Sequence, residues 1–340
     1  MSAARRLALD ALRRDPIQPA ALRVLGQVVS AGGGSAAEQK ALPLVLASQR
    51  LSRRELLTQL WLIDYYARRG DPEAMVRQFD LALRSSESAR GTIFPLLDAA
   101  AFDPAVREAL LDALAKRPNW AEPLATFAAH YGTNLDFSLE LARMLLDPRT
   151  KEDRFKYLGL IHRLVEAGRF QRAWQVYNDP SLGLGPEGVG TIRNGTFEAP
   201  EDASPFDWSF VQEPELWASR EQLANNRSVL RVAAYNGRSG DVAWQLLHLA
   251  PGNYEASALV GGVLTASVER PRLRIECAGG GAVLLSLRSD AGGAQPRTMR
   301  GRLAVPSNCA FQRVSISASG DGAPKETSPW VDDVRIRRIR

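Results

Sequence analysis

Few residues of this 340-residue chain could carry out catalysis. The three histidines, His130, His162 and His248, each lack a Cys, a second His or an acid at a metal-binding spacing, so we expect no zinc site. A serine nucleophile elbow needs Gly-x-Ser-x-Gly, which residues 237–240 do not supply, and neither a P-loop nor a dinucleotide fingerprint is present. We therefore expect no enzyme, although two carboxylates that met in a cleft could still cleave a glycosidic bond.

Aromatic side chains in the second half offer a different chemistry, because an exposed ring beside an amide or carboxylate can bind a sugar. Trp217 lies in a polar stretch, residues 213–226, and is the ring most expected at the surface, followed by Tyr235, with Trp208 as a further candidate. Most rings in a β-sandwich are core residues, and that alternative stays open for each of them. The candidates are Trp208, Trp217, Tyr235, Trp244, Tyr254 and Trp330.

Cys277 and Cys309 are the only cysteines, and both lie at the edges of predicted strands. They either pair, because neighbouring strands approach closely there, or remain two buried thiols of the kind found in cytosolic cores. A disulfide would contribute roughly 3–4 kcal/mol in the chain-entropy model. It would also imply an oxidising compartment.

Composition predicts two soluble globular domains, with 45% hydrophobic and 24% charged residues. The net charge of +5 is spread over both halves, so a concentrated basic face for nucleic acid is not expected. The one basic run, residues 335–340, alternates with isoleucine and is interpreted as the solvent face of a last strand. No apolar run is long enough to cross a membrane. Because the chain starts inside what looks like a repeat, we expect an export signal or membrane anchor upstream of it.

The first half has helical periodicity. Apolar residues recur at three and four positions in short segments separated by Gly, Pro or Asp-Pro. Helices joined by tight turns favour an α-solenoid, with an irregular helical bundle as the alternative. The predicted helices span residues 3–14, 18–31, 36–48, 52–69, 72–86, 89–100, 104–116, 120–131, 136–147, 151–167 and 170–178.

One unit of this half, residues 157–177, is the most regular. Gly168 ends its first helix, and Ala173 and Tyr177 lie four apart on the packing face of its second. This unit resembles a tetratricopeptide repeat, and residues 61–82 form a more degenerate copy. The resemblance implies a concave surface that binds a segment of a protein partner.

The second half changes to a period of two. Residues 181–190, rich in Gly and Pro, are predicted to link a helical domain (1–180) to a β domain (191–340). Predicted strands span 228–235, 242–249, 254–259, 273–277, 283–287 and 313–317. We therefore predict a multidomain α plus all-β fold, in which a helical-repeat α-solenoid is followed by a β-sandwich jelly roll.

Four motifs are distributed over the β domain. In order and spacing they resemble carbohydrate-binding modules of families 4 and 9, which are galactose-binding-like jelly rolls. The resemblance covers nearly all of residues 191–340 and implies a glycan ligand, although many jelly rolls of this superfamily bind no sugar. The motifs are Asn194-Gly195 with Phe197-Glu198, Phe206-Asp207-Trp208, Trp244-Gln245 through Pro251-Gly252 to Tyr254, and Trp330 with Asp332-Asp333.

The same resemblance implies a structural calcium ion. The positions that match the family's ligands are Glu198 and Asp333, with Asp332 as an equal alternative, together with backbone carbonyls near the first turn. Hard oxygen ligands of this kind suit Ca²⁺. The alternative is that these acids only cap strand ends.

Two functional hypotheses follow. The first is a non-catalytic adaptor, periplasmic or otherwise extracytoplasmic, in bacterial exopolysaccharide or cell-surface assembly, whose helical repeats bind a protein and whose sandwich binds a glycan. The second is a purely protein-binding scaffold subunit of a secretion or polysaccharide-biosynthesis complex. The two differ in whether Trp217 and Tyr235 share one exposed groove.

Overall fold

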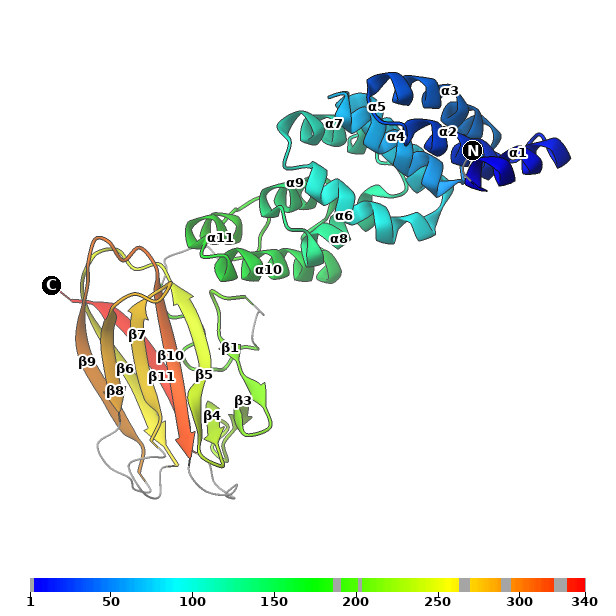
Figure 1. Cartoon of the computed structure of the whole chain (residues 1–340). Coiled ribbons are helices and arrows are strands. Elements are labelled where there is room, and N and C mark those ends of the chain that lie inside the picture. The colour runs from blue at the N-terminus through cyan, green and yellow to red at the C-terminus, as the bar shows by residue number, and fades with distance from the viewer. Residues whose placement is uncertain are drawn as a thin grey trace. The chain divides into compact units, whose positions relative to one another are not determined.

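The computed structural model describes residues 3–185, 191–200, 204–262, 270–288, 295–320 and 329–339. The described part of the first half is helical and that of the second half consists of two antiparallel sheets, which confirms the α plus all-β prediction (Figure 1). Contacts divide the chain into two compact units, Met1–Leu160 and Ile161–Arg340. The domain limits at 180 and 191 stay predictions, and residues 186–190 of the predicted linker lie outside the described residues.

Eleven α-helices occur in the described residues, and each coincides with a predicted helix to within a few residues. A short 3-10 turn (Glu87–Ala89) precedes the sixth. The helices are α1 (Ala3–Arg14), α2 (Pro19–Ser30), α3 (Ser35–Leu51), α4 (Leu56–Arg68), α5 (Pro72–Ser85), α6 (Arg90–Ala100), α7 (Pro104–Leu114), α8 (Ala121–Tyr131), α9 (Leu135–Leu145), α10 (Lys151–Glu166) and α11 (Phe170–Tyr177).

The Asp-Pro pairs begin helices for a local reason. Asp71 accepts a hydrogen bond from the Ala74 amide at 2.9 Å, and Asp103 accepts one from the Ala105 amide at 2.9 Å. Each aspartate thus satisfies an amide that the first helical turn leaves unpaired, while the proline after it occupies a position that needs no donor. These caps explain why the Asp-Pro pairs that separate the helical segments in the sequence lie at the starts of helices.

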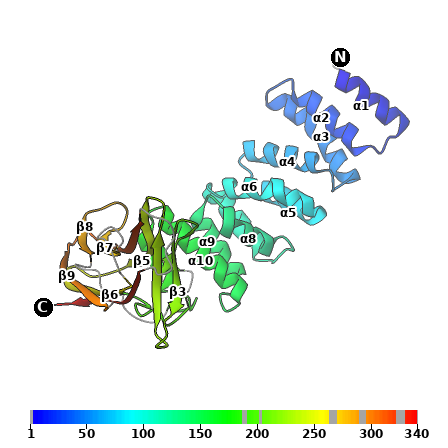
Figure 2. The same ribbon diagram turned by 90° about the horizontal axis from the view of Figure 1, so that it is seen from below.

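Helices of the first unit contact mainly their neighbours in sequence: α1 packs on α2, α2 on α3, α4 on α5 and α8 on α9. Figure 2 shows α1 to α9 following one another stepwise. Trp120 lies fully inside and donates from Nε1 to Asp80 Oδ1 at 2.8 Å. The helical half is thus present, and its assignment to the tetratricopeptide type stays a prediction.

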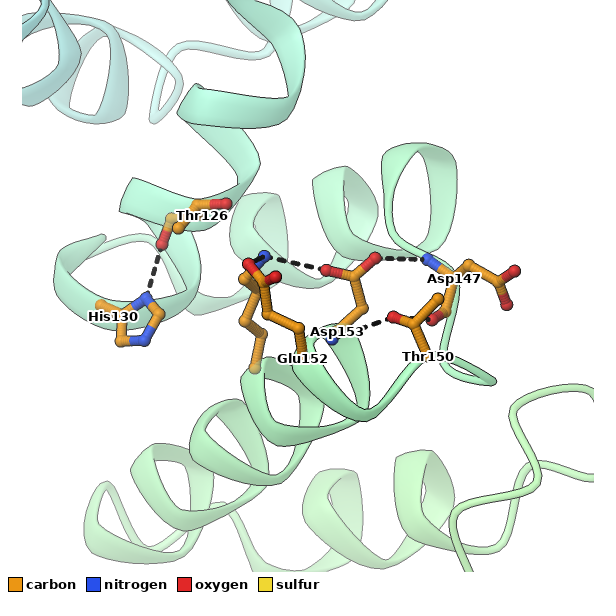
Figure 3. Close-up of polar contacts among 7 residues, drawn as sticks. Thr126, His130, Asp147, Thr150, Glu152 and Asp153 are labelled. Atoms are coloured by element: carbon orange, nitrogen blue, oxygen red, sulfur yellow. Dashed lines mark hydrogen bonds and ion pairs between the residues drawn. The ribbon is translucent and has the colours of Figure 1, made fainter.

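A polar cluster fixes the start of α10 (Figure 3). The Asp153 amide donates to the Thr150 hydroxyl at 3.2 Å, and the Asp153 carboxylate accepts from the Asp147 amide at 3.0 Å. Lys156 donates to Asp153 at 2.8 Å and to Glu152 at 2.9 Å. Burial opposes the charge on Lys156, but these hydrogen bonds outweigh it and raise its pKa. The lysine therefore stays protonated and acts as a structural ion, not as a nucleophile.

The two sheets of the second unit form a β-sandwich. One has five strands in the order β1-β5-β10-β7-β8, and the other has six in the order β2-β3-β4-β11-β6-β9. The strands are β1 (Ser209–Phe210), β2 (Gln212–Glu213), β3 (Leu216–Gln222), β4 (Ser228–Ala234), β5 (Arg238–Leu247), β6 (Gly252–Gly261), β7 (Arg272–Cys277), β8 (Val283–Arg288), β9 (Arg297–Val305), β10 (Gln312–Gly320) and β11 (Trp330–Arg338).

Strand β11 shows how the sandwich uses its two faces. Val334 and Ile336 are buried in the core, whereas Arg335 and Arg337 alternate with them and are exposed. A bulge with Asp333 at φ 50° interrupts the pairing to β6 and resets the alternation. Arg335 and Arg337 of the basic run therefore lie on the outer face of the last strand, as predicted. Arg338 pairs with the core residue Tyr254, and residue 340 lies outside the described residues.

Helix α11 belongs to the second unit, because it packs on the sandwich through aromatic rings. Trp174 lies 5.0 Å from Phe206 and 5.2 Å from His248, measured between ring centroids. Tyr177 is buried and lies 5.0 Å from Phe206. We call this set the aromatic seam, and its members are Phe170, Trp174 and Tyr177 of α11 and Phe206, His248 and Phe311 of the sandwich.

The two cysteines are bonded to each other. Cys277 is the last residue of β7, and Cys309 lies in the loop before β10, 32 positions later. The disulfide thus joins two segments at the end of the sheet where Phe311 of the aromatic seam lies. Of the two alternatives that the sequence left open, the structure has the paired one.

Candidate functional site

The outer face of the six-stranded sheet carries polar and aromatic side chains. Its strands alternate, so that residues such as Ala218, Val232 and Ala256 point into the core while their neighbours point outward. Strand pairing then defines which outward residues lie side by side. This surface, which we call the outer face, holds both of the rings that the sequence placed at the surface.

Trp217 and Tyr235 occupy the same face of two neighbouring strands. Trp217 on β3 pairs with Ala233 on β4, and Tyr235 follows Ala233 by two positions, so it points to the same side. The Tyr235 amide donates to the Glu215 carbonyl at 3.0 Å, which keeps the two segments paired there. Diagonal neighbours of this kind are about 7–8 Å apart at Cα, within reach of two aromatic rings. Both rings are half-buried.

A charged pair lies further along the same two strands, with Arg231 as a diagonal neighbour of Trp217. Arg231 on β4 donates to Glu221 on β3 through two hydrogen bonds of 2.7 and 2.6 Å. The hydrogen bonds from Arg231 lower the Glu221 pKa, so the carboxylate stays ionised. Arg231 also pairs with Ser219 across the strands. The rings and the polar groups that could hydrogen-bond a hydroxyl therefore share one surface.

Trp208 is not part of this surface, which corrects its prediction as a glycan-binding residue. Only 1% of it is exposed, and its ring packs on Phe197 in the sandwich core at 5.4 Å. Tyr254 is also a core residue, and its hydroxyl donates to the Ala250 carbonyl at 2.7 Å. A buried ring has no face to offer to a sugar.

The other two tryptophans are held in place by neighbours. The Trp330 ring lies across Gly261 of β6, where a Cβ atom would come within 2.1 Å of it, and Trp330 is buried. Trp244, on the five-stranded sheet, has the Arg313 guanidinium over its ring at 5.3 Å and His162 at its edge. Arg313 in turn bonds Asp241 at 2.8 Å. Both rings are thus already engaged.

The first turn of the sandwich lies against the last strand. The Val334 amide donates to the Gly195 carbonyl at 2.8 Å. A Cβ atom on residue 195 would lie 2.1 Å from the Val334 carbonyl oxygen, so only glycine fits. The buried Gln245 side chain bonds both the amide and the carbonyl of Arg193, at 2.8 and 3.1 Å. These contacts anchor the entry into the sandwich.

The acids expected to hold calcium each have another partner. Glu198 accepts from the Ser228 amide at 3.1 Å, and Asp333 bonds Arg335 at 2.6 Å. Asp332 is buried and forms an ion pair with Arg227. Burial raises the Asp332 pKa, against the opposing effects of the Asp333 amide and of Arg227.

These residues do not fit a calcium ion in this arrangement. Calcium needs six to eight oxygen ligands around one centre, with several carboxylates free to approach it. Two of the three predicted carboxylates are neutralised by arginine. Among the described residues no group of three or more His, Cys, Asp or Glu side chains is placed to hold a metal.

Sequence reasoning missed Glu221 and Arg231. Both lie in segments whose strand alternation is readable: Glu221 follows Trp217 by four positions, and Arg231 lies two positions before Ala233. The missing information was that β3 exists at all and pairs with β4. Had residues 216–222 been predicted as a strand, their outward positions would have followed.

Comparisons with known proteins identify no family: no family model matches the chain, and no curated protein matches it. Several solved structures match part of the chain. A family 61 carbohydrate-binding module in complex with β-1,4-galactotriose is 14% identical, with a TM-score of 0.33, over 45% of this chain and 100% of that one. A family 4 module is 16% identical, with a TM-score of 0.34, over 44% and 99%. A module of Cellvibrio mixtus lichenase 5A, in complex with cellotriose, is 13% identical, with a TM-score of 0.28, over 45% and 98%.

Proposed function

We propose that this chain is a non-catalytic, extracytoplasmic adaptor, in which the outer face binds a glycan and the helical unit binds a protein partner. Bacterial exopolysaccharide or cell-surface assembly would use such a pairing.

One observation carries the glycan part of the proposal. Trp217 and Tyr235 lie at diagonal positions on the same face, and Arg231, which bonds Glu221, is the diagonal neighbour of Trp217 on its other side. Two rings can stack on sugar rings, while a guanidinium donates to hydroxyls and a carboxylate accepts from them. Aromatic and polar groups in this combination are what a sugar needs from a surface.

The helical unit offers a place for a protein segment. A cavity of about 310 Å³ lies where α4 and α5 meet α6 and α7, and its lining includes Ala67, Met75, Ala99 and Val106. Phe102, which follows Ala99 in the chain, is 63% exposed. An exposed aromatic ring beside an apolar hollow favours a partner that buries both.

An extracytoplasmic location is part of the same proposal. The Cys277–Cys309 disulfide supports it, because structural disulfides persist in oxidising compartments and are rare in the cytosol. In the described part of the chain no helix is long and apolar enough to span a membrane.

The non-catalytic part rests on how the acids are held. Glu198 and Glu221 both line a cavity of about 370 Å³. Glu221 is ionised and bound to Arg231, and Glu198 accepts from a backbone amide. A glycosidase needs one carboxyl with a raised pKa to protonate the leaving group, whereas the hydrogen bonds from Arg231 lower the pKa of Glu221.

The test is binding of the full chain to a panel of soluble bacterial and plant polysaccharides by affinity electrophoresis. We expect Trp217→Ala to weaken binding at least tenfold and Tyr235→Ala to weaken it less. Tyr131→Ala is the matched control, because Tyr131 lies on α8 and is 72% exposed. Unchanged binding by Trp217→Ala would refute the assignment of the outer face.

The second candidate is a scaffold that binds only proteins, and the same hollow beside Phe102 supports it. It predicts that the wild-type chain, shown to be folded, binds no polysaccharide of the panel. It also predicts that Phe102→Ala removes a partner from a pull-down while Trp217→Ala leaves that partner bound. The pair of variants thus separates the two candidates.

A further inference from the structure

Four arginines form a regular array on the outer face. Arg335 on β11 pairs with Ser257 on β6, and Ser257 pairs with Arg300 on β9. One step along the strands, Arg337 pairs with Glu255, and Glu255 pairs with Arg302. We call these six residues the arginine grid, which has two rows with the order Arg, polar residue, Arg.

The spacing of the grid follows from sheet geometry. Adjacent strands lie about 4.8 Å apart, so the two arginines of a row are about 10 Å apart at Cα, and the rows are about 7 Å apart. The residues between them, such as Val334, Ile336 and Ala256, are core residues. Because successive side chains alternate, the whole grid points to one side.

The grid is accessible and carries excess positive charge. The side chains of Arg335, Arg337 and Arg300 are 60%, 64% and 59% exposed. Glu255 lies between Arg337 at 3.1 Å and Arg300 at 3.9 Å, and Asp333 bonds Arg335. Among the described residues Arg302 has no carboxylate partner. Exposed ion pairs of this kind are weak, so they do not prevent the guanidiniums from binding another anion.

The chemistry of the grid favours carboxylates on a sugar chain. A guanidinium presents a planar fork of donors that matches a carboxylate through two hydrogen bonds. Glu255 and Ser257, between the arginines, can accept hydrogen bonds from hydroxyl groups. An array that alternates carboxylate-binding and hydroxyl-binding groups is complementary to a polymer that carries both.

Two other polyanions fit less well. Binding of single-stranded nucleic acid relies on aromatic side chains interleaved with the basic groups, whereas none of the six grid residues is aromatic. Trp217, the nearer of the two rings named on this face, is about 20 Å away along the strands. Binding at a lipid surface relies on large exposed apolar side chains. None of the described residues on β6, β9 or β11 is a large exposed hydrophobic.

We propose that the arginine grid binds the carboxylates of an acidic, uronate-containing polysaccharide. This inference rests on the proposed function, since it names the class of glycan that the outer face takes. Trp217 on β3 and Tyr235 directly after β4 belong to the same sheet face as the grid. The register of β4 with β11 places the grid about 20 Å further along the strands, so a polymer that contacts both must run diagonally across the sheet.

The test uses the full chain and matched polymers: polygalacturonate, its fully methyl-esterified form, and alginate. Esterification removes the negative charge and keeps the backbone. We expect binding to polygalacturonate or alginate and at least tenfold weaker binding to the ester. We also expect a marked loss of affinity between about 50 and 200 mM salt, as electrostatic binding requires.

Two double variants locate the effect. Arg300→Gln with Arg302→Gln should weaken binding to the acidic polymer at least tenfold. The control, Arg272→Gln with Arg288→Gln, removes the same charge from β7 and β8 of the other sheet and should change binding less than twofold. Circular dichroism and a melting curve show that each variant is folded.

The outcomes separate this inference from the proposed function. If the chain binds polygalacturonate and its ester equally, and Trp217→Ala loses this binding, the role of the arginine grid is refuted while glycan binding by the outer face is retained. Equal losses in both double variants overturn the grid in favour of general charge attraction. Binding to phosphatidylglycerol vesicles but to neither acidic polymer overturns it in favour of a lipid surface. Binding to no polysaccharide at all overturns both proposals.

Discussion

The sandwich has two outer faces that share the same pleated geometry and differ in which outward positions are apolar. On the five-stranded sheet, the outward residues Leu246 and His248 at the end of β5 are covered by the chain's own segments and by the rings of α11. The outward residues Arg274, Glu276 and Arg313 on β7 and β10 of that sheet form ion pairs instead. On the six-stranded sheet the outward positions hold Arg, Glu and Ser beside Trp217. Apolar outward residues require a cover, whereas polar ones leave a face that a ligand can use. What alternates outward therefore decides which part of a face the chain covers and which part stays open to solvent.

The largest expected effect tests the covered face. Phe206 is buried between Trp174 and Tyr177, so Phe206→Ala leaves a cavity in the aromatic seam and should cost about 3–5 kcal/mol of unfolding free energy. Urea denaturation of the full chain measures it. Trp217→Ala, on the other face, should cost less than about 1 kcal/mol while it weakens glycan binding. Equal losses of unfolding free energy in the two variants would contradict the distinction between the covered and the open face.

Removal of the disulfide should have the next largest effect. Cys277→Ser with Cys309→Ser releases a constraint at the seam end of the five-stranded sheet, and about 3–4 kcal/mol of stability should be lost in the chain-entropy model. Urea denaturation measures the loss, and dithiothreitol should reproduce it in the wild type. Glycan binding below the unfolding transition should not change. A variant as stable as the wild type would show that the bond does not hold the seam end together.

A pH effect should distinguish the two faces further. Burial lowers the pKa of His248 below 6.5, because the seam disfavours a charged ring. The unfolded chain then takes up a proton near pH 6.5, where the folded chain does not, so stability is present above pH 6.5 and is lost as pH falls below it. Urea midpoints at pH 7.5 and 5.0 should differ more for the wild type than for His248→Phe. An identical pH dependence of the two proteins would contradict the role of His248.

The smallest expected effect concerns calcium. Asp332 and Asp333 are bound to arginines, so millimolar calcium should leave the melting temperature unchanged relative to a chelator. Differential scanning calorimetry of the wild type decides this. A clear rise in melting temperature with calcium, lost in Asp333→Asn, would show that these acids exchange their arginine partners for the ion.

Sequence patterns predicted the helices closely because two local signals agreed, namely the apolar spacing and the Asp-Pro caps at residues such as Asp71 and Asp103. Strands β3 and β9 were missed for the opposite reason. Their inward residues are few, for example Leu216 and Ala218 in β3, and their outward residues are charged. Such strands form because their neighbours supply the pairing, which no local signal reports.

The site was predictable only in part, for a similar reason. A polar neighbourhood indicated the partial exposure of Trp217, but nothing in the local sequence revealed that Trp208 fills the core. The arginine grid joins residues from three strands far apart in the chain, so it depends on the register of β6 with both β9 and β11. Register is a property of the folded sheet and was not available from composition or spacing.

The aromatic seam also decides how this protein can be shortened. A fragment that begins at residue 191 would bring Phe206, His248 and Phe311 into water as a contiguous apolar patch, which favours self-association. A fragment that begins at Lys151 would retain both α10 and α11 and keep that patch shielded from water. The solubility of the sandwich thus depends on a helix outside its own sheets, which covers its apolar patch.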